Sequence, residues 1–349
     1  MTITILCAGA VALPAGGDAA ATLLPAGSPL ARRLARARLL RQHRDDAPMP
    51  DELPHEAWLR ERFGITGSVA GCALAAGHTP LDDALLVRPV HLHVGLDHLR
   101  LAPPRLLDIS EREAQALVER ANQMLADSGL VAHAMQADAW ALAALPGATE
   151  GRQLLAELAA LHARSARMAE GRQIDVYLPS GTAARQWRRL STEVQMAWFE
   201  HPVNQQREAS GQAVINSLWL DGSVGRAARQ PFQRIVADDP ALLGLARRAG
   251  IECLPFSGAS PALAGVSGDS WLIAPDLWHT PGSDGDLPGW QQAWHEFAGW
   301  FERNAAALPA PLHLVLTGER SLVELQLSPS DRWAFWRRRP LAELIETDA

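Results

Sequence analysis

The spacing of hydrophobic and polar positions predicts strands that alternate with helices along most of the chain. Residues 2–8 are apolar and favour a first strand, with a secretory signal peptide as the competing interpretation. We favour the strand, because the positively charged segment that opens a signal peptide is missing. Further strands are expected at 85–101 as a pair, at 131–140, 174–178 and 217–220, and around Arg234, Ile251, Trp271, Leu312 and Val323.

Helix signals are clearest at 182–200, where large apolar side chains recur at steps of three and four residues: Trp187, Leu190, Val194 and Trp198. Ser110 and Glu113 form a capping box that opens a helix ending at Gly129. Ser28 and Pro29 open a helix that is expected to carry five arginines: Arg32, Arg33, Arg36, Arg38 and Arg41. A short helix through Trp58 ends at Gly64, and others are expected at 151–171, 240–250 and 288–308.

This alternation predicts an α/β layered fold with a central mixed, largely parallel sheet flanked by helices. The antiparallel part is expected from the last two strands, which follow each other closely enough for a hairpin. With 349 residues and 48% hydrophobic content, we expect one main α/β body over 1–349. Residues 1–84 are expected to form a semi-independent N-terminal part of it.

Composition excludes several chemistries. All 32 basic residues are arginine, so a P-loop, a protein kinase or a Schiff-base enzyme cannot be built without its lysine. The net charge of −7 predicts neither nucleic acid nor membrane as a partner. Three separated cysteines, without a C-x-x-C pair, fit a reducing compartment, and no apolar run is long enough to span a bilayer. We therefore expect a cytoplasmic protein.

The first candidate site is the sequence PVHLHVGLDH at 89–98. His91 and His93 lie two apart in an expected strand, so both rings face one side, and Asp97 and His98 follow a glycine turn. Imidazole and carboxylate groups suit zinc, manganese or iron, which makes these four residues candidate metal ligands. A structural histidine cluster and a metal-free proton-transfer site are the alternatives. The sequence requires no cofactor, although it allows a divalent metal.

The second candidate site surrounds the segment EHPVNQQRE at 200–208. A helix is expected to end before Pro202, which places His201 at its last turn, where the helix dipole favours a cation. The next turn and strand would present the remaining polar groups of a pocket for a small anion or carboxylate. The candidate pocket residues are Asp97, His98, His201, Asn204, Arg207, Glu208 and Asn216. The alternative is a polar network that anchors a tight connection between a helix and a strand.

Three further groups are less specific. Acidic and histidine side chains in a Gly/Pro-rich loop, at Asp276, His279, Asp284 and Asp286, are most simply a solvated turn. Trp290, Trp294 and Trp300 repeat at helical spacing and predict packing or a partner surface. Trp333 and Trp336 beside 337–339 form an arginine and tryptophan cluster, which either contacts an anionic partner or belongs to a docked C-terminal helix. No G-x-S-x-G, H-E-x-x-H or deaminase motif is present.

Three segments resemble the RpfE-type regulatory proteins of proteobacteria: HLHVGLDHLRL at 91–101, QADAWAL at 136–142 and QWRRLSTEVQMAWFEHPVNQQREASGQAVINSLWL at 186–220. The resemblance extends over about residues 55 to 340 and is most specific in the last block. His93 stands where the family pattern has glutamine. The resemblance implies a cytoplasmic protein with no settled biochemical activity.

Members of that family are often described as similar to cofactor-independent phosphoglycerate mutase, of the alkaline phosphatase superfamily. Such enzymes need an aspartate just after the first strand and further Asp and His ligands for two metals. Here the first strand ends in Cys7, Ala8 and Gly9, and no acid precedes Asp18. We therefore expect a regulatory or small-ligand-sensing protein with a small anionic ligand or a protein partner. The alternative is a metal-dependent phosphomutase or phosphohydrolase acting on a small phosphorylated metabolite.

Overall fold

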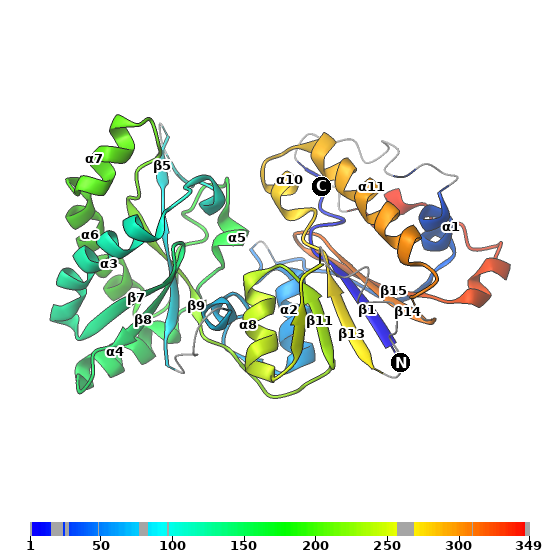
Figure 1. Cartoon of the computed structure of the whole chain (residues 1–349), viewed down its shortest axis with the longest axis horizontal. Coiled ribbons are helices and arrows are strands. Elements are labelled where there is room, and N and C mark those ends of the chain that lie inside the picture. The colour runs from blue at the N-terminus through cyan, green and yellow to red at the C-terminus, as the bar shows by residue number, and fades with distance from the viewer. Residues whose placement is uncertain are drawn as a thin grey trace. The chain divides into compact units, whose positions relative to one another are not determined.

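The computed structural model describes residues 2–14, 24, 28–47, 49–76, 83–95, 98–256, 269–308 and 310–345. These form two compact units (Figure 1). Unit 1 combines Met1–Phe63 with Arg229–Ala349, and unit 2 is Gly64–Ala228. Each unit is described by itself.

Unit 1 is built on a seven-stranded sheet with the order β12-β11-β13-β1-β14-β15-β2. The first five strands are parallel, and the last two pairings, β14 with β15 and β15 with β2, are antiparallel. The strand bounds are β1 Thr2–Cys7, β2 Arg38–Arg44, β11 Arg234–Ala237, β12 Glu252–Leu254, β13 Ser270–Ala274, β14 Leu312–Thr317 and β15 Ser321–Leu327.

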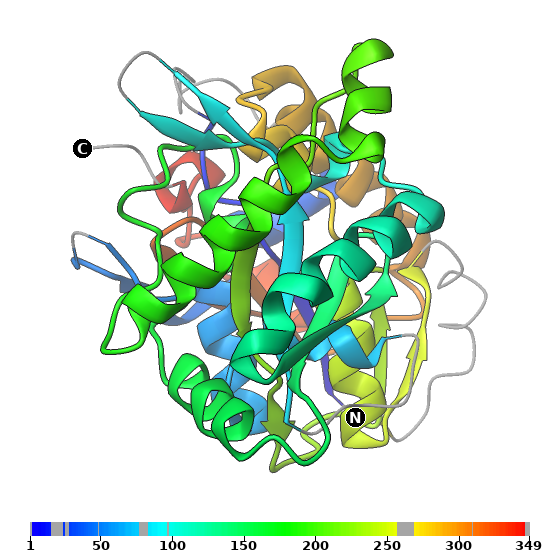
Figure 2. The same cartoon turned by 90° about the vertical axis from the view of Figure 1, so that its left-hand side faces the viewer.

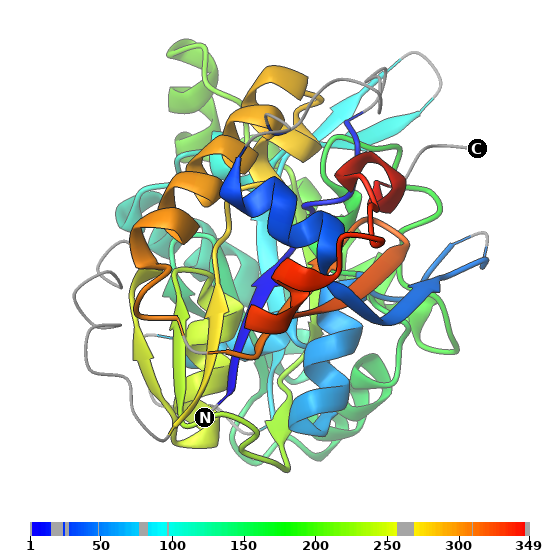
Figure 3. The same cartoon turned by 90° about the vertical axis from the view of Figure 1, so that its right-hand side faces the viewer.

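Helices cover both faces of this sheet. In Figure 3, α1 (Pro29–Arg36) and α11 (Leu287–Asn304) lie in front of the strands. Figure 1 shows α2 (Pro54–Phe63) and α8 (Pro240–Ala249) on the other side. Among the described residues of this unit, the other helical segments are α10 His279–Ser283, η5 Pro329–Trp333 and η6 Leu341–Leu344.

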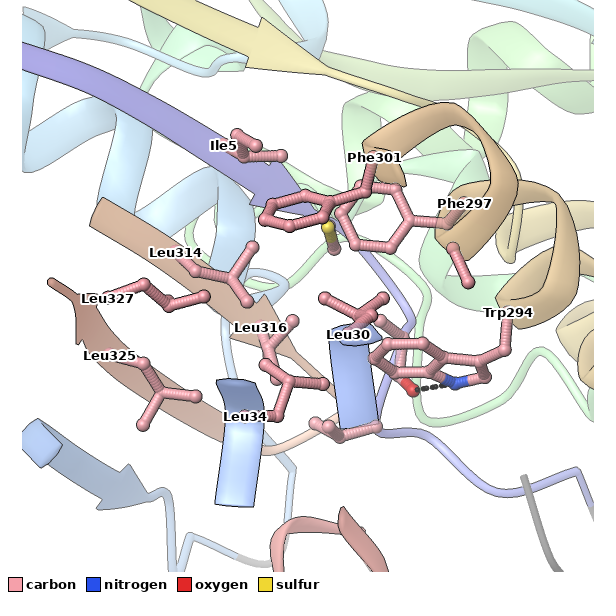
Figure 4. Close-up of a cluster of buried hydrophobic side chains, with 14 of the residues drawn as sticks. Ile5, Leu30, Leu34, Trp294, Phe297, Phe301, Leu314, Leu316, Leu325 and Leu327 are labelled. Atoms are coloured by element: carbon pink, nitrogen blue, oxygen red, sulfur yellow. Dashed lines mark hydrogen bonds between the residues drawn. The ribbon is translucent and has the colours of Figure 1, made fainter. Parts of the chain in front are cut away.

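The main core of unit 1 lies between the sheet and the layer of α1 and α11. Alternate residues of the central strand β1, Ile3 and Ile5, are fully buried in this core, and Figure 4 shows Ile5. Aromatic side chains of α11 and leucines of α1 close over them, including Trp294, Phe297, Phe301, Leu30 and Leu34. The opposite face of β1 is buried as well, as expected for a parallel strand between two helix layers.

Unit 2 has a four-stranded antiparallel sheet with the order β7-β8-β4-β9. Its strands are β4 Leu85–Val90, β7 Leu130–Gln136, β8 Ala139–Ala144 and β9 Ser217–Ser223. In Figure 2, α3 (Glu111–Leu125) and α6 (Ala184–Phe199) lie across one face of these strands, and α6 contributes Trp187, Leu190, Val194 and Trp198 to the core.

Smaller elements complete unit 2. A hairpin joins β5 (Leu92–Val94) to β6 (Leu99–Leu101), and β3 (Ile65–Thr66) pairs with β10 (Arg226–Ala227). The other helical segments are η1 Ala70–Ala75, η2 Pro104–Leu106, η3 Ala126–Ser128, α4 Thr149–Ala159, α5 Ala166–Ala169 and α7 Pro202–Ala209.

The predicted fold class is confirmed: a mixed, largely parallel sheet lies between helices, and its antiparallel part begins with the final hairpin. The division of the chain differs from the expected N-terminal part at 1–84. Because β1 is the central strand of the seven-stranded sheet, residues up to Phe63 belong with the C-terminal part, and those from Gly64 belong to unit 2.

Three element predictions are wrong in detail. The helix expected at 151–171 ends at Ala159, since the backbone of His162 exchanges hydrogen bonds with Ser180 and leads the chain away. Residues 174–178 form a local turn, in which the amides of Tyr177 and Leu178 donate to the Ile174 carbonyl.

The helix opened by Ser28 is shorter than expected. It ends at Arg36, and the following arginines belong to strand β2, whose backbone pairs with β15. Arg38 and Arg41 therefore lie in a strand at the edge of the sheet.

Within the part of the chain that the structure describes, no helix has the length and apolar character needed to cross a bilayer.

Candidate functional site

The two sequence blocks singled out as sites meet in unit 2, where side chains of each block bind the backbone of the other. The His91 ring donates from Nδ1 to the carbonyl oxygen of Val214 at 2.8 Å. The side-chain oxygen of Asn216 accepts from the Leu92 amide at 2.7 Å, and its Nδ2 donates to the Leu92 carbonyl at 3.0 Å. The start of the β5–β6 hairpin is thus fastened to the segment that leads into β9.

His91 is half-buried, and burial lowers the pKa of its imidazole. The hydrogen bond to Val214 opposes this shift, and the charges of His93 and Arg207 add to it. The ring is therefore held in its neutral form, as a donor to a backbone carbonyl. This contact corresponds to the structural alternative for the histidine cluster.

The other proposed metal ligands are arranged differently. His93 is exposed on β5, opposite Arg100 in the hairpin register, and its ring centroid lies 6.2 Å from that of His91. His98 Nε2 accepts from Arg100 Nε at 3.1 Å. Asp97 lies outside the described residues. Within the ranges that are described, no three His, Cys, Asp or Glu side chains are grouped as a metal site would require, so the four-residue metal set stays a prediction.

Asn204 is 4% exposed and uses its whole side-chain amide on the backbone. Nδ2 donates to the carbonyl oxygens of Trp198 and Ile215 at 2.9 and 2.8 Å, and Oδ1 accepts from the Ile215 amide at 2.8 Å. A buried amide that makes these bonds fixes the end of α6 against the start of β9, because any rotation would leave polar groups unpaired.

Arg207 is 1% exposed, although arginine is rarely found fully buried. Its Nε donates to the Ala213 carbonyl at 2.7 Å, Nη2 donates to the Leu107 carbonyl, and Nη1 forms an ion pair with Glu113 Oε1 at 2.8 Å. All three guanidinium nitrogens are therefore engaged within the protein. Glu208, the next residue, is exposed.

The expected role of His201 is wrong. The residue does not end a helix; it is the N-cap of α7, and its Nδ1 accepts from the Val203 amide at 3.2 Å. Burial and the nearby charge of Arg120 lower the pKa of His201, which disfavours the cation that the sequence reasoning expected. Pro202 at the first helical position produces this geometry, since proline suits the start of a helix.

Two polar contacts of unit 2 were not predicted from the sequence. Glu113 was recognised as half of a capping box, but not as the ion-pair partner of Arg207. Asp221, 2% exposed in β9, accepts from Arg88 Nε at 2.6 Å and from the Ala166 amide. A lone carboxylate in the apolar strand LWLDGS was the available signal, because buried acids are nearly always paired.

In unit 1, tryptophans occupy the carboxyl end of the central strand β1. Trp290 Nε1 donates to the Gly9 carbonyl at 3.0 Å, and Trp294 Nε1 donates to the Ala10 carbonyl at the same distance (Figure 4 draws the Trp294 bond). Both side chains and Trp278 are fully buried. Burial also raises the pKa of the Cys7 thiol, which keeps it protonated. Packing of the tryptophan repeat, one of its two predicted roles, is confirmed for Trp290, Trp294 and Trp300.

The acidic loop and the C-terminal aromatic cluster are mostly exposed to solvent. Asp286 caps α11 by accepting from the Gly289 amide at 3.0 Å, while Asp276 and Asp284 are exposed. Trp333 and Trp336 are 67% and 68% exposed, around short 3₁₀ turns instead of a docked C-terminal helix.

No family model matches the sequence, and the search of curated proteins gives no significant match. Among solved structures, the chain is similar to the PH0037 protein from Pyrococcus horikoshii, with a TM-score of 0.57, 12% identity, and coverage of 97% of this chain and 90% of that one. A cofactor-independent phosphoglycerate mutase from Thermoplasma acidophilum gives a TM-score of 0.41 with 13% identity over 94% of this chain and 90% of that one. The similarity to the PH0037 protein, at 12% identity, concerns the fold alone. The chain thus has an α/β fold similar to that of the PH0037 protein.

Proposed function

We propose that this chain is a non-catalytic regulatory or ligand-sensing protein of the RpfE type. The observation that carries the proposal is the state of Arg207, the residue expected to hold an anion. An arginine that binds a ligand must present free N–H groups at a surface the ligand can reach. Arg207 is buried, and Leu107, Ala213 and Glu113 accept from its nitrogens.

The rest of the block supports the same proposal. Asn204 and Asn216 bond to backbone groups of their own unit, and His201 caps a helix. Residues that match the RpfE pattern therefore stabilise the connection from α6 to β9. Their occurrence together is explained by this structural role without any catalytic one.

Unit 1 gives further support. In the alkaline phosphatase superfamily, the first metal ligand is an aspartate just after the first strand. Here Ala8 and Gly9 follow a neutral, buried Cys7, and Trp290 binds the Gly9 carbonyl. The metal-dependent phosphomutase or phosphohydrolase remains the competing function, but no contact among the described residues favours it.

We also place the protein in a reducing, cytoplasmic compartment. All three cysteines are free thiols, and two of them, Cys7 and Cys72, are buried. Secreted proteins of this kind more often pair their cysteines.

The test combines three measurements on the purified full chain: metal content, thermal shift with phosphorylated and carboxylated metabolites, and turnover of phosphoglycerate and p-nitrophenyl phosphate with added Mn²⁺ or Mg²⁺. We expect a saturable shift with at least one metabolite and no turnover. Turnover that increases with bound metal would overturn the non-catalytic proposal, and the absence of any shift would overturn ligand sensing.

A further inference from the structure

An arginine-lined pocket lies in unit 1, where α1 meets the 3₁₀ turn η5. Its volume is about 410 Å³, within the range of small-molecule sites. Arg32, Arg33 and Arg36 enter it from α1, and Arg332 enters it from η5. Segments about 300 residues apart in the sequence therefore each contribute arginines to the lining of one pocket.

The positive charge of this pocket is largely uncompensated. Asp331 is the acidic side chain in its wall; Asp331 accepts from the Ser328 amide at 2.7 Å and pairs with Arg337 at 3.2 Å. In the described part of the chain, none of the four pocket arginines forms an ion pair with a carboxylate. Such clustering is unexpected in a protein of net charge −7, because like charges repel unless a ligand or partner compensates them.

Arginines elsewhere in the same unit behave differently. Arg60 pairs with Glu52, Arg62 with Glu324, and Arg234 with Glu252. These three arginines are each paired with a carboxylate, whereas, among the residues that the structure describes, the four arginines that line the pocket are not.

Contacts restrict two of these arginine side chains, Arg36 and Arg33. Arg36 Nη1 donates to the Arg332 carbonyl at 2.9 Å, and the Arg339 amide donates to the Ala35 carbonyl at 3.0 Å. The Arg33 guanidinium lies 5.2 Å from the ring centroid of the buried Phe301. Side chains held in this way lose less conformational entropy when an anion binds.

We propose that this pocket binds a compact polyanion with adjacent phosphate groups, of the diphosphate ester class. Each guanidinium can donate two parallel hydrogen bonds to phosphate oxygens. Several guanidinium groups therefore suit a ligand with several negative charges better than a ligand with a single carboxylate. Pro29, Leu327 and Pro329 provide an apolar wall for the carbon part of the ester. The inference deepens the proposed ligand-sensing function and rests on it.

Phosphate groups have a second source, the headgroups of anionic lipids. Trp333 and Trp336 are exposed near Arg332, and aromatic side chains beside arginines suit a membrane interface. The experiment therefore includes a lipid arm.

The test is calorimetric titration of inorganic pyrophosphate into the full chain at 150 mM NaCl. We expect saturable binding that weakens at least tenfold in Arg32→Gln/Arg36→Gln and measurably in Arg32→Gln alone. The single variant keeps the bond from Arg36 to Arg332, so it separates charge from local folding. The matched control is Arg229→Gln/Arg247→Gln, which removes two exposed arginines of the same unit outside the pocket and should leave the affinity unchanged.

Three results would overturn the inference. The first is no binding of pyrophosphate, and the second is equal affinity in the pocket and control variants. The third is binding to phosphatidylglycerol vesicles alone, if that binding is lost in Trp333→Ala/Trp336→Ala. In each case a thermal shift with another metabolite leaves ligand sensing intact. Metal-dependent turnover would overturn the proposed non-catalytic function even if pyrophosphate binds in this pocket, so the two failures are distinguishable.

Discussion

Arg207 and Glu113 form an ion pair across 94 positions of sequence, with Nη1 2.8 Å from Oε1. The pair joins α7 to the first turn of α3. Glu113 also accepts from the hydroxyl and amide of Ser110, at 2.7 and 2.8 Å, so one carboxylate both caps a helix and anchors the buried guanidinium. Burial alone would raise the pKa of Glu113, but the bonds from Ser110 and Arg207 outweigh it and hold the pKa below its ordinary value.

Arg207→Met should lower the free energy of unfolding of unit 2 by about 3 kcal/mol. The substitution keeps an apolar stem of similar length but leaves the carbonyls of Leu107 and Ala213 without their donor. Urea denaturation followed by circular dichroism measures the loss. Glu208→Gln, at the exposed neighbouring position, is the control and should change stability by less than about 0.5 kcal/mol. Equal effects of the two substitutions would show that the buried bonds of Arg207 do not stabilise the protein.

His201→Ala should cost about 1 kcal/mol, because the Val203 amide loses its cap. His201→Asn should recover most of this loss, since asparagine is among the best capping residues. The pKa of His201 is lowered in the folded protein, so its contribution is present above the ordinary histidine pKa and is lost as the pH falls through the lowered value. Stability measured from pH 8 to 5 should therefore decline more steeply in the parent protein than in His201→Asn; parallel curves would contradict this.

The elements that the sequence predicted well have local signals strong enough to decide their structure. The capping box at Ser110 and the apolar repeat of 182–200 are both present as expected. A cap and a helical stripe depend on residues three or four apart, so sequence spacing alone is informative.

Failures came where distant parts of the chain decide the outcome. Arg38 and Arg41 were assigned to a helix, but they lie in a strand because β15 pairs with their segment from almost 300 residues away. Likewise, the role of the block around Arg207 depended on burial, which its spacing in the sequence does not reveal. Whether a polar side chain faces a ligand or a backbone carbonyl cannot be decided from its spacing in sequence.

Glu324 lies at the centre of a small charged cluster in unit 1, and it should dominate the acid sensitivity of that unit. Its side chain is 7% exposed and lies 2.9 Å from His313 Nε2, 3.4 Å from Arg62 and 3.7 Å from Arg41. The bond with His313 and the two arginine charges lower the pKa of Glu324, although burial opposes the shift.

Because that folded-state pKa is lowered, the stabilisation is present above the ordinary glutamate pKa of about 4.3 and is lost as the pH falls through the lowered value. Glu324→Gln should be less stable than the parent at pH 7 but should lose less further stability below about pH 4.3. Unfolding midpoints in urea from pH 7 to 3 measure this. Glu343→Gln, at an exposed position, should reproduce the parent curve, and an unchanged curve for Glu324→Gln would show that another group controls the acid response.

The buried tryptophans at the carboxyl end of β1 predict that the loss of stability at Trp294 depends on how much of the side chain is removed. Trp294→Phe keeps most of the buried ring but removes the bond to the Ala10 carbonyl, and it should cost about 1 to 2 kcal/mol. Trp294→Ala also empties the space between Phe297 and Trp278 and should cost about 3 to 5 kcal/mol. Trp333→Phe, at a side chain that is 67% exposed, should change stability by less than about 0.5 kcal/mol. Thermal and urea unfolding of the three variants measure the loss of stability in each. If Trp294→Phe loses no more stability than Trp333→Phe, the bond from the Trp294 indole to the Ala10 carbonyl does not stabilise the fold.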